Sequence, residues 1–180
     1  MKLDAPVQDA IDFYLTQAAE GVAAGVFVRD KPRPANRSFY VHRVITRREP
    51  GGDPAHQFDC DESIFISIEY SVTRRIPGLY GYLTLQRLDG TIVYEGDSTD
   101  ARVNPLNNLM VGTGILTVEI PPRILGAGNY QIYLSFASNV DVAGPAIDIP
   151  GIVSEIRLDD PSSRLGNRRA GYLSLKLDWK

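Results

Sequence analysis

The residues that most often do chemistry are scarce in this sequence. Its 180 residues include one cysteine, Cys60, and two histidines, His42 and His56. A lone cysteine forms no internal disulfide and offers no thiolate pair for zinc, and the acidic neighbours of Cys60 should raise its pKa. The motifs GxxxxGK(S/T), GxSxG and HExxH are absent. We therefore expect no enzyme, no catalytic residue, no metal site and no cofactor.

Two charged segments each allow two interpretations. The acidic turn 59–62 could suit a calcium ion, but its spacing differs from that of an EF-hand loop, and we favour an ordinary surface turn. Residues 29–48 contain one acid, Asp30, against seven bases. This basic stretch could meet an anionic partner (a phosphate, an acidic glycan or an acidic protein surface), or it could be a solvated linker and edge strand. We favour the second interpretation. The seven bases are Arg29, Lys31, Arg33, Arg37, Arg43, Arg47 and Arg48.

The whole chain is weakly acidic, with 22 Asp and Glu against 19 Lys and Arg and a net charge of −3. That balance argues against binding to nucleic acid through a strongly positive surface. The start of the chain does not have the pattern of a signal peptide, and no apolar run is long enough to span a bilayer. We expect a cytoplasmic location.

The elements that must position any site are mostly strands. Residues 4–20 have helical spacing with a glycine stop, and 22–38 predict a linker, so we divide the chain into 1–38 (helix and linker) and 39–180. After residue 38 the hydrophobic period becomes 2. We expect an all-β, antiparallel β-sandwich, immunoglobulin-like or jelly-roll-like, with a short N-terminal helix. Asp89-Gly90 predicts a two-residue hairpin turn. The predicted strands are 39–47, 64–72, 80–88, 91–95, 114–120, 130–138, 152–158 and 170–179.

The last predicted strand alternates clearly. Leu173, Leu175, Leu177 and Trp179 should face inward, while residues 172, 174, 176 and 178 face outward. The polar loop 159–167 before it could fold the strand back or let it cross to a neighbouring copy. The sequence leaves both arrangements open.

Several outward-facing strand residues could bind a sugar, because tyrosine rings suit apolar sugar faces and planar polar groups suit hydroxyls. The alternative is that they are ordinary solvated strand residues. The candidate carbohydrate-binding residues are Tyr80, Tyr82, Gln86, Gln131, Tyr133, Glu69, Tyr172 and Lys176.

An ordered set of segments resembles a known family. The run 58–70 combines an aromatic residue, an acidic turn and a long alternating strand. The Asp89-Gly90 hairpin, Gly128-Asn129-Tyr130 and the run 171–179 follow it. In this order they resemble the C-terminal domain of the ATP-binding subunit of polysaccharide ABC exporters of the Wzt type, over about residues 6–179. The chain departs from the pattern at Asp61, where a glycine is often expected.

This resemblance implies non-catalytic recognition of an O-antigen (lipopolysaccharide) glycan for export, at the cytoplasmic face of the inner membrane. It also implies a homodimer with exchanged C-terminal strands, and the nucleotide-binding and transmembrane parts of an exporter as partners. The ATPase would lie in a separate upstream domain. The competing hypothesis is a structural or protein-interaction sandwich without a sugar ligand, because a sandwich scaffold alone does not choose a function.

Overall fold

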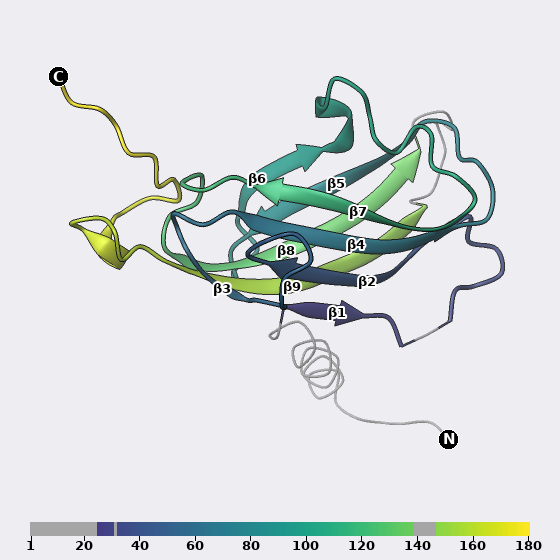
Figure 1. Ribbon diagram of the computed structural model, residues 1–180, viewed down its shortest axis with the longest axis horizontal. Helices are drawn as coiled ribbons and strands as arrows, with labels where there is room; N and C mark the ends of the chain where they lie inside the picture. Colours follow the sequence, from purple (N-terminus) through teal and green to yellow (C-terminus); the bar gives the residue numbers. More distant parts are fainter. Residues whose placement is uncertain (1–24, 31, 139–146) are drawn as a thin grey trace.

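The computed structural model describes residues 25–30, 32–138 and 147–180, and it shows two stacked β-sheets (Figure 1). One sheet has the strand order β1-β2-β4-β7 and the other β3-β9-β8-β5-β6. All pairings are antiparallel except that of β3 with β9. The predicted antiparallel β-sandwich is confirmed. The strands are β1 (Val26–Val28), β2 (Phe39–Arg47), β3 (Gln57–Asp59), β4 (Ile64–Val72), β5 (Leu79–Gln86), β6 (Ile92–Asp97), β7 (Gly112–Ile120), β8 (Gly128–Ser138) and β9 (Asp148–Asp159), with two short 3-10 turns, Ser98–Asp100 and Gly166–Arg168.

The core lies between the two sheets and is built from the inward side of each alternating strand. In β4 the five residues Ile64, Ile66, Ile68, Tyr70 and Val72 are all at most 8% exposed. Phe39 of β2 packs against residues of both sheets. Its ring centroid lies 5.3 Å from that of Tyr70 in its own sheet and 4.7 Å from that of Phe136 in the opposite sheet. Burial of such a contiguous apolar layer is the main source of stability.

The strands differ from the sequence-based prediction in a few places. β1 lies inside the predicted linker 22–38, and β3 was not predicted. Both are three residues long, which is too short for an alternating pattern to stand out. The predicted helix 4–20 lies outside the described residues. Within the part of the chain that is described, no helix has the length and apolarity needed to cross a bilayer.

The hairpin at Asp89-Gly90 forms with one more residue than predicted. The Arg87 amide donates to the Thr91 carbonyl at 2.8 Å, which leaves Leu88, Asp89 and Gly90 as a three-residue loop. Gly90 has φ +82°, the left-handed conformation that such loops require at their last position. Asp89 therefore precedes the loop's left-handed position and accepts a hydrogen bond from the Thr91 amide at 2.9 Å.

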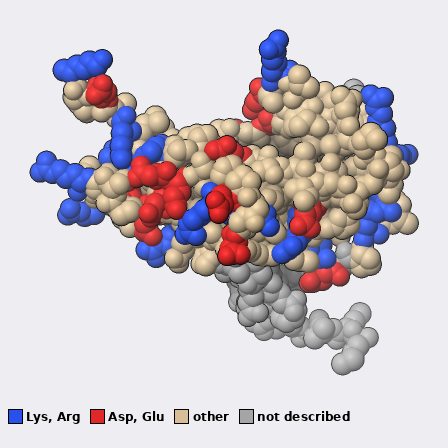
Figure 2. All heavy atoms as spheres, viewed as in Figure 1, with Lys and Arg blue, Asp and Glu red and all other residues tan. Residues whose placement is uncertain are grey.

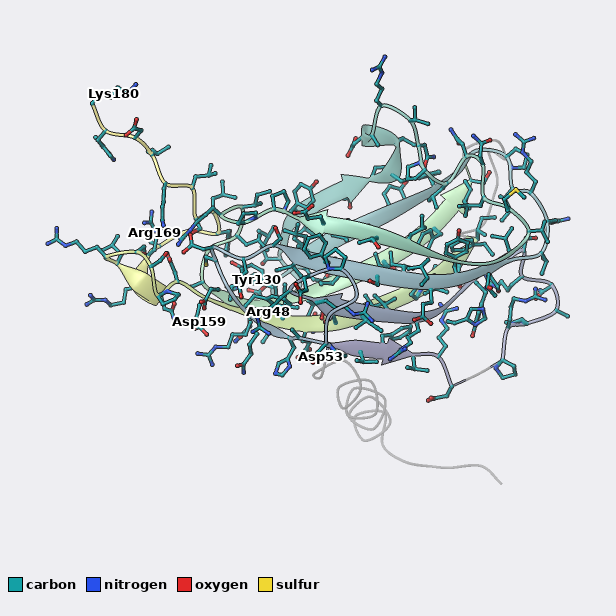
Figure 3. The ribbon with its side chains drawn as sticks, viewed as in Figure 1. Arg48, Asp53, Tyr130, Asp159, Arg169 and Lys180 are labelled. Carbon is teal, nitrogen blue, oxygen red and sulfur yellow. The ribbon has the colours of Figure 1, made fainter. Side chains whose placement is uncertain are left out.

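The prediction of a sheet strand over 170–179 is wrong for this single chain. The segment makes one isolated bridge, between Leu173 and Leu125, and then leaves the sandwich, so that Lys180 lies far from it (Figures 1 and 3). The predicted division into an inward and an outward face is not found either, because Ser174 is the only buried residue of 171–180, and Leu173, Leu175 and Leu177 are exposed. A strand needs a neighbouring edge and an apolar surface to cover, and this segment meets neither in its own chain beyond Ser174.

Candidate functional site

The outer face of the five-stranded sheet gathers five of the eight predicted sugar-binding residues. In its register Tyr82 pairs with Ser135, Thr84 with Tyr133, and Gln86 with Gln131. Directly paired residues project from the same face, so these three pairs form successive rows across β5 and β8. Tyr80 lies two residues before Tyr82 on the same face. On the neighbouring strand β6, Asp97 pairs with Tyr82 and Glu95 with Thr84. We call this set of residues, with Glu155 of β9, the outer platform.

Two tyrosines at one end of the outer platform hold each other in place. The rings of Tyr80 and Tyr82 are 5.0 Å apart and 80° to one another, and the Tyr82 hydroxyl donates to the Tyr80 hydroxyl at 2.9 Å. That hydrogen bond, together with burial and the charges of Asp97 and Glu95, raises the pKa of Tyr82 to about 12. Both rings are half-buried, so part of each ring remains accessible to a ligand.

A row of side-chain hydrogen bonds crosses the other end of the outer platform. The Gln86 amide donates to Oε1 of Gln131 at 3.1 Å, and the Gln131 amide donates to Oε1 of Glu155 at 2.8 Å. Glu155 pairs directly with Gln131 in the sheet register. The sequence analysis did not select Glu155. The available sequence signal was the alternation of Glu155 and Arg157 with Ile156 and Leu158 in the predicted strand 152–158, which places Glu155 on the polar side.

The other three predicted residues lie away from the outer platform. Glu69 belongs to β4 of the opposite sheet, where it lies 3.6 Å from Arg43. Tyr172 lies near the start of the C-terminal segment, with the Arg87 guanidinium 5.6 Å from its ring centroid. Lys176 lies 3.4 Å from Asp61 of the acidic turn. Glu69 points outward from β4 as alternation predicted, and Tyr172 and Lys176 are exposed, but alternation carries no information about which sheet a residue joins.

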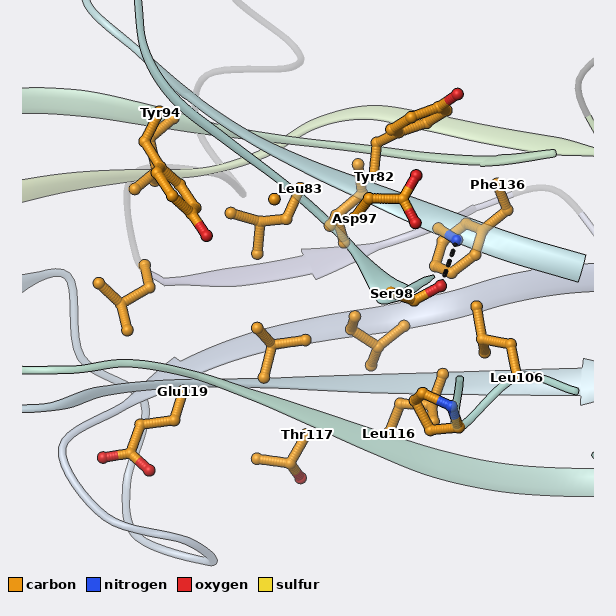
Figure 4. Close-up of a pocket in the computed structure, with 18 of the residues that line it drawn as sticks. Tyr82, Leu83, Tyr94, Asp97, Ser98, Leu106, Leu116, Thr117, Glu119 and Phe136 are labelled. Carbon is orange, nitrogen blue, oxygen red and sulfur yellow. Dashed lines mark hydrogen bonds between the residues drawn. The ribbon is translucent and has the colours of Figure 1, made fainter. Parts of the chain in front are cut away.

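A largely apolar pocket opens between the edge strands of the two sheets, with a volume of about 250 Å³ (Figure 4). Leu83, Tyr94, Leu116 and Phe136 are among its lining residues. The Tyr82 ring points away from this pocket, toward the outer platform (Figure 4). Val118 of β7 pairs with the buried Ile66 and so faces inward, yet it is still 37% exposed. The sandwich is therefore open at this edge.

The acidic turn is tied to the start of the C-terminal segment by Arg123. This residue has φ +65°, and its guanidinium contacts Asp61 and Ser162 and lies 2.8 Å from Asp160 and 2.9 Å from the Ser174 hydroxyl. Hydrogen bonds from Arg123 and Ser162 hold the pKa of Asp61 well below its usual range. We call these residues the Arg123 cluster; Figure 2 shows acidic and basic side chains gathered at this end of the molecule.

The environment of the acidic turn favours a structural role. Burial and the nearby charge of Asp160 raise the pKa of Cys60, as expected for a poor thiolate. Among the described residues, no group of three or more His, Cys, Asp or Glu side chains is arranged to hold a metal ion. The turn is instead held to the end of β9, since the Cys60 amide donates to the Asp159 carbonyl at 2.8 Å.

Much of the basic stretch is engaged within the chain, which favours the structural interpretation of its charge. Arg29 lies 2.8 Å from the buried Asp148 and 4.5 Å from the Tyr40 ring centroid. Arg37 donates to the Ile147 carbonyl at 2.6 Å, and Arg48 lies 3.1 Å from Glu62. Lys31 lies outside the described residues.

No protein-family model matches this sequence, and no curated protein matches it either. Among solved structures, the fold is similar to the crystal structure of the C-terminal domain of Wzt, with a TM-score of 0.65 and 11% sequence identity. The similarity covers 91% of this chain and 95% of that domain. It shows that the chain has the β-sandwich fold of a Wzt C-terminal domain.

Proposed function

We propose that this chain is a non-catalytic domain that recognises an O-antigen glycan for export by an ABC transporter. The observation that carries the proposal is the outer platform, where three tyrosines and two glutamines share one face of one sheet. The fold similarity to the C-terminal domain of Wzt supports it, as does the order of segments that resembles the same family.

The outer platform offers the two kinds of contact that a sugar needs. The rings of Tyr80, Tyr82 and Tyr133 can contact apolar sugar C–H faces, while the amides of Gln86 and Gln131 can exchange hydrogen bonds with hydroxyls. Each such bond replaces a bond to water, so the net gain per hydroxyl is small and the affinity of one site should be modest. Binding requires no bond to be broken.

We propose further that the chain forms a homodimer by exchange of its C-terminal segment. Leu173, Leu175, Leu177 and Trp179 are 56–91% exposed and alternate as one side of a strand. β7 pairs only with β4 among the described strands, and the apolar pocket lies directly beside it. The surface over β7 carries few charged side chains (Figure 2).

In this arrangement the segment of one copy extends along β7 of the other, and its apolar side chains enter the pocket. Residues 173–179 would span roughly 23 Å, and the nine residues of β7 roughly 30 Å, so the lengths are compatible. A dimer with two outer platforms would bind a repeating polymer more tightly than one platform does, provided that both reach one chain.

The remaining parts of the proposal follow from the exporter role. Residues 1–38 would be a helix and linker leading to the sandwich 39–180, with β1 of that linker paired to the edge of β2, and an ATPase would lie in an upstream domain. The partners would be the nucleotide-binding and transmembrane parts of the exporter, at the cytoplasmic face of the inner membrane.

An NMR titration of the ¹⁵N-labelled full chain tests the glycan proposal. The probe is O-polysaccharide purified from the source strain, and polysaccharide from an unrelated strain is the control ligand. We expect shifts confined to the outer strand faces of β5 and β8 with the first and none with the second. The double variant Tyr82→Ala/Tyr133→Ala should lose these shifts and remain folded.

Tyr94→Ala is the matched control variant, because Tyr94 lies on the same sheet but faces the pocket, and it should keep the shifts. The absence of shifts with either polysaccharide would reject glycan binding and favour a protein-interaction domain. If the chemical shift changes persist in Tyr82→Ala/Tyr133→Ala, the glycan does not bind at the outer platform.

A further inference from the structure

The outer platform has a strongly uneven distribution of charge. Strands β5, β6 and β8 contain no Lys or Arg, while Glu95 and Asp97 project from β6 on one side and Glu155 from β9 on the other. The nearest base along β9 is Arg157, which lies 3.3 Å from Asp159. A ligand on the platform therefore sits between carboxylates and meets no free cation on these strands.

The row Gln86–Gln131–Glu155 also has a fixed direction. A carboxylate only accepts hydrogen bonds, so Glu155 draws the amide nitrogen of Gln131 toward itself. The carbonyl of Gln131 must then face Gln86, whose amide nitrogen donates to it. This leaves the Gln86 carbonyl and its second N–H without a partner in the row. Through its hydrogen bond with Gln131, Glu155 therefore orients Gln86 so that the Gln86 carbonyl and one N–H are available to a ligand.

We propose that the outer platform selects uncharged glycans, with Glu155 as a positioning residue that orients the two glutamines toward sugar hydroxyls. This inference rests on the proposed glycan function and adds the ligand class. Sugar hydroxyls both donate and accept, and they match a glutamine that presents one free donor and one free acceptor. Carboxylated or phosphorylated sugars would face Glu95, Asp97 and Glu155 without a cation to balance them, and like charges brought together suppress binding.

The hydrogen bond with Tyr80 and burial are the main causes of the raised pKa of Tyr82, and Asp97 and Glu95 add to it because both disfavour a negative charge on the Tyr82 oxygen. The same two carboxylates would disfavour an anionic group on a sugar held against that ring. The hydroxyl of Tyr82 is already donated to Tyr80, so it offers an acceptor to a neutral hydroxyl and no free proton to an anion.

The test compares one polysaccharide in two charge states. The probes are O-polysaccharide from the source strain, unmodified and with part of its primary hydroxyls oxidised to carboxylates. Binding to the full chain is measured by calorimetry and by ¹⁵N shifts of the outer platform. At ~0.02 M salt we expect the oxidised form to bind at least about tenfold more weakly, and at ~0.5 M salt the difference should shrink, because salt screens exposed charges.

Variants separate the local effect from overall charge. Glu95→Gln/Glu155→Gln should reduce the discrimination against the oxidised form. Glu69→Gln is the matched control, since it removes the same charge from the opposite sheet and should leave the discrimination unchanged. Glu155→Gln alone should weaken binding of the unmodified form by about fivefold, the cost of one lost orientation, and shift the side-chain NH₂ resonances of Gln86 and Gln131.

The outcomes are distinguishable from those of the proposed function. If neither form shifts the outer platform, glycan recognition itself fails. If the oxidised form binds the outer platform as tightly as the unmodified form, or if the unmodified polysaccharide is itself anionic and binds there, selection for uncharged glycans is overturned. If Glu155→Gln moves neither the glutamine NH₂ resonances nor the affinity, Glu155 has no positioning role.

Discussion

Two segments of this chain have almost the same sequence pattern and opposite surroundings. β4 (Ile64–Val72) alternates large apolar and smaller or polar residues, and so do residues 172–179. The apolar side of β4 is at most 8% exposed because β2 and β7 flank it and the second sheet covers it. The apolar residues of the C-terminal segment are 56–91% exposed.

The difference shows what alternation specifies and what it does not. A period of 2 predicts which side chains share a face, and in β4 they do. It does not supply the neighbouring strand or the apolar layer that the face requires. β4 finds both within its own chain, whereas the C-terminal segment lacks both beyond Ser174, and the proposed strand exchange would supply them.

The largest expected difference between the two segments is in their contribution to unfolding free energy. Ile66→Ala should cost about 4 kcal/mol, because Ile66 is fully buried and its truncation leaves a cavity. Leu177→Ala should change the value by less than about 0.5 kcal/mol in dilute protein, because Leu177 is exposed. Urea unfolding followed by far-UV circular dichroism measures both. If Leu177→Ala lost as much unfolding free energy as Ile66→Ala at every protein concentration, the C-terminal segment would pack on the sandwich of its own chain.

Replacing Arg123 should disrupt the contacts that hold the start of the C-terminal segment to the sandwich. Arg123→Met should cost about 3 kcal/mol, because the side chain of Asp160 is 1% exposed and would lose its closest ion pair. Arg157→Met is the matched control: its pair with Asp159 is exposed, so its loss should cost less than about 1 kcal/mol. Equal costs for the two variants would contradict the structural role of the Arg123 cluster.

Strand exchange predicts that the apolar side of the C-terminal segment controls association. Leu175→Asp/Leu177→Asp should weaken the dimer by at least about thirtyfold, or about 2 kcal/mol, as measured by sedimentation velocity over a range of concentrations. Leu165→Asp, which changes another exposed leucine in the preceding loop, is the control and should remain dimeric.

Val118→Lys tests the β7 edge, which would accept the exchanged segment, because it places a charge in the apolar pocket beside β7. We expect it to weaken the dimer as well. If Val118→Lys still dimerises but the leucine variant does not, strand exchange remains supported. The exchanged segment would then pair with an edge strand other than β7. A wild-type chain that is monomeric at all concentrations would reject exchange.

The smallest effect concerns pH at the Arg123 cluster. Burial alone would raise the pKa of Asp160, but hydrogen bonds from Ser163 and Arg123 and the charge of Arg123 outweigh it, so its pKa is lowered. The pKa of Asp61 is lowered as well. Carboxyls with lower pKa values in the folded state contribute stability that is complete above the usual Asp value of about 4 and is lost as pH falls below it.

Urea midpoints measured from about pH 6 to pH 3 should therefore stay level to about pH 4 and then decline. The decline should be shallower in Arg123→Met, which lacks the partner that lowers both pKa values. A midpoint that rises below pH 4 would contradict the assignment.

In the outer platform, as in the two segments, alternation predicts the direction of side chains but not their neighbours on other strands. Alternation correctly predicted that Tyr80, Tyr82, Gln86, Gln131 and Tyr133 point outward, because they alternate along β5 and β8 with buried residues such as Leu83, Leu85, Ile132 and Leu134. It grouped them with Glu69, which belongs to the other sheet, and with Tyr172 and Lys176, which contact the Arg87 side chain and the Arg123 cluster instead. It gave Glu155 no role, because the row Gln86–Gln131–Glu155 exists only once three strands are in register.

Local patterns thus specified the class of fold, most strand positions, the left-handed glycine at residue 90 and the outward direction of the candidate side chains. These depend on neighbours within a few residues, which any stretch of sequence displays. Tertiary structure decided which strands pair, which outward residues share the outer platform, that Arg123 joins Asp61 to Asp160, and that residues 173–179 leave the sandwich. These depend on contacts between residues far apart in the sequence, from 24 positions for Gln131 and Glu155 to 62 for Asp61 and Arg123, and such contacts are set by the packing of the two sheets and not by any local period.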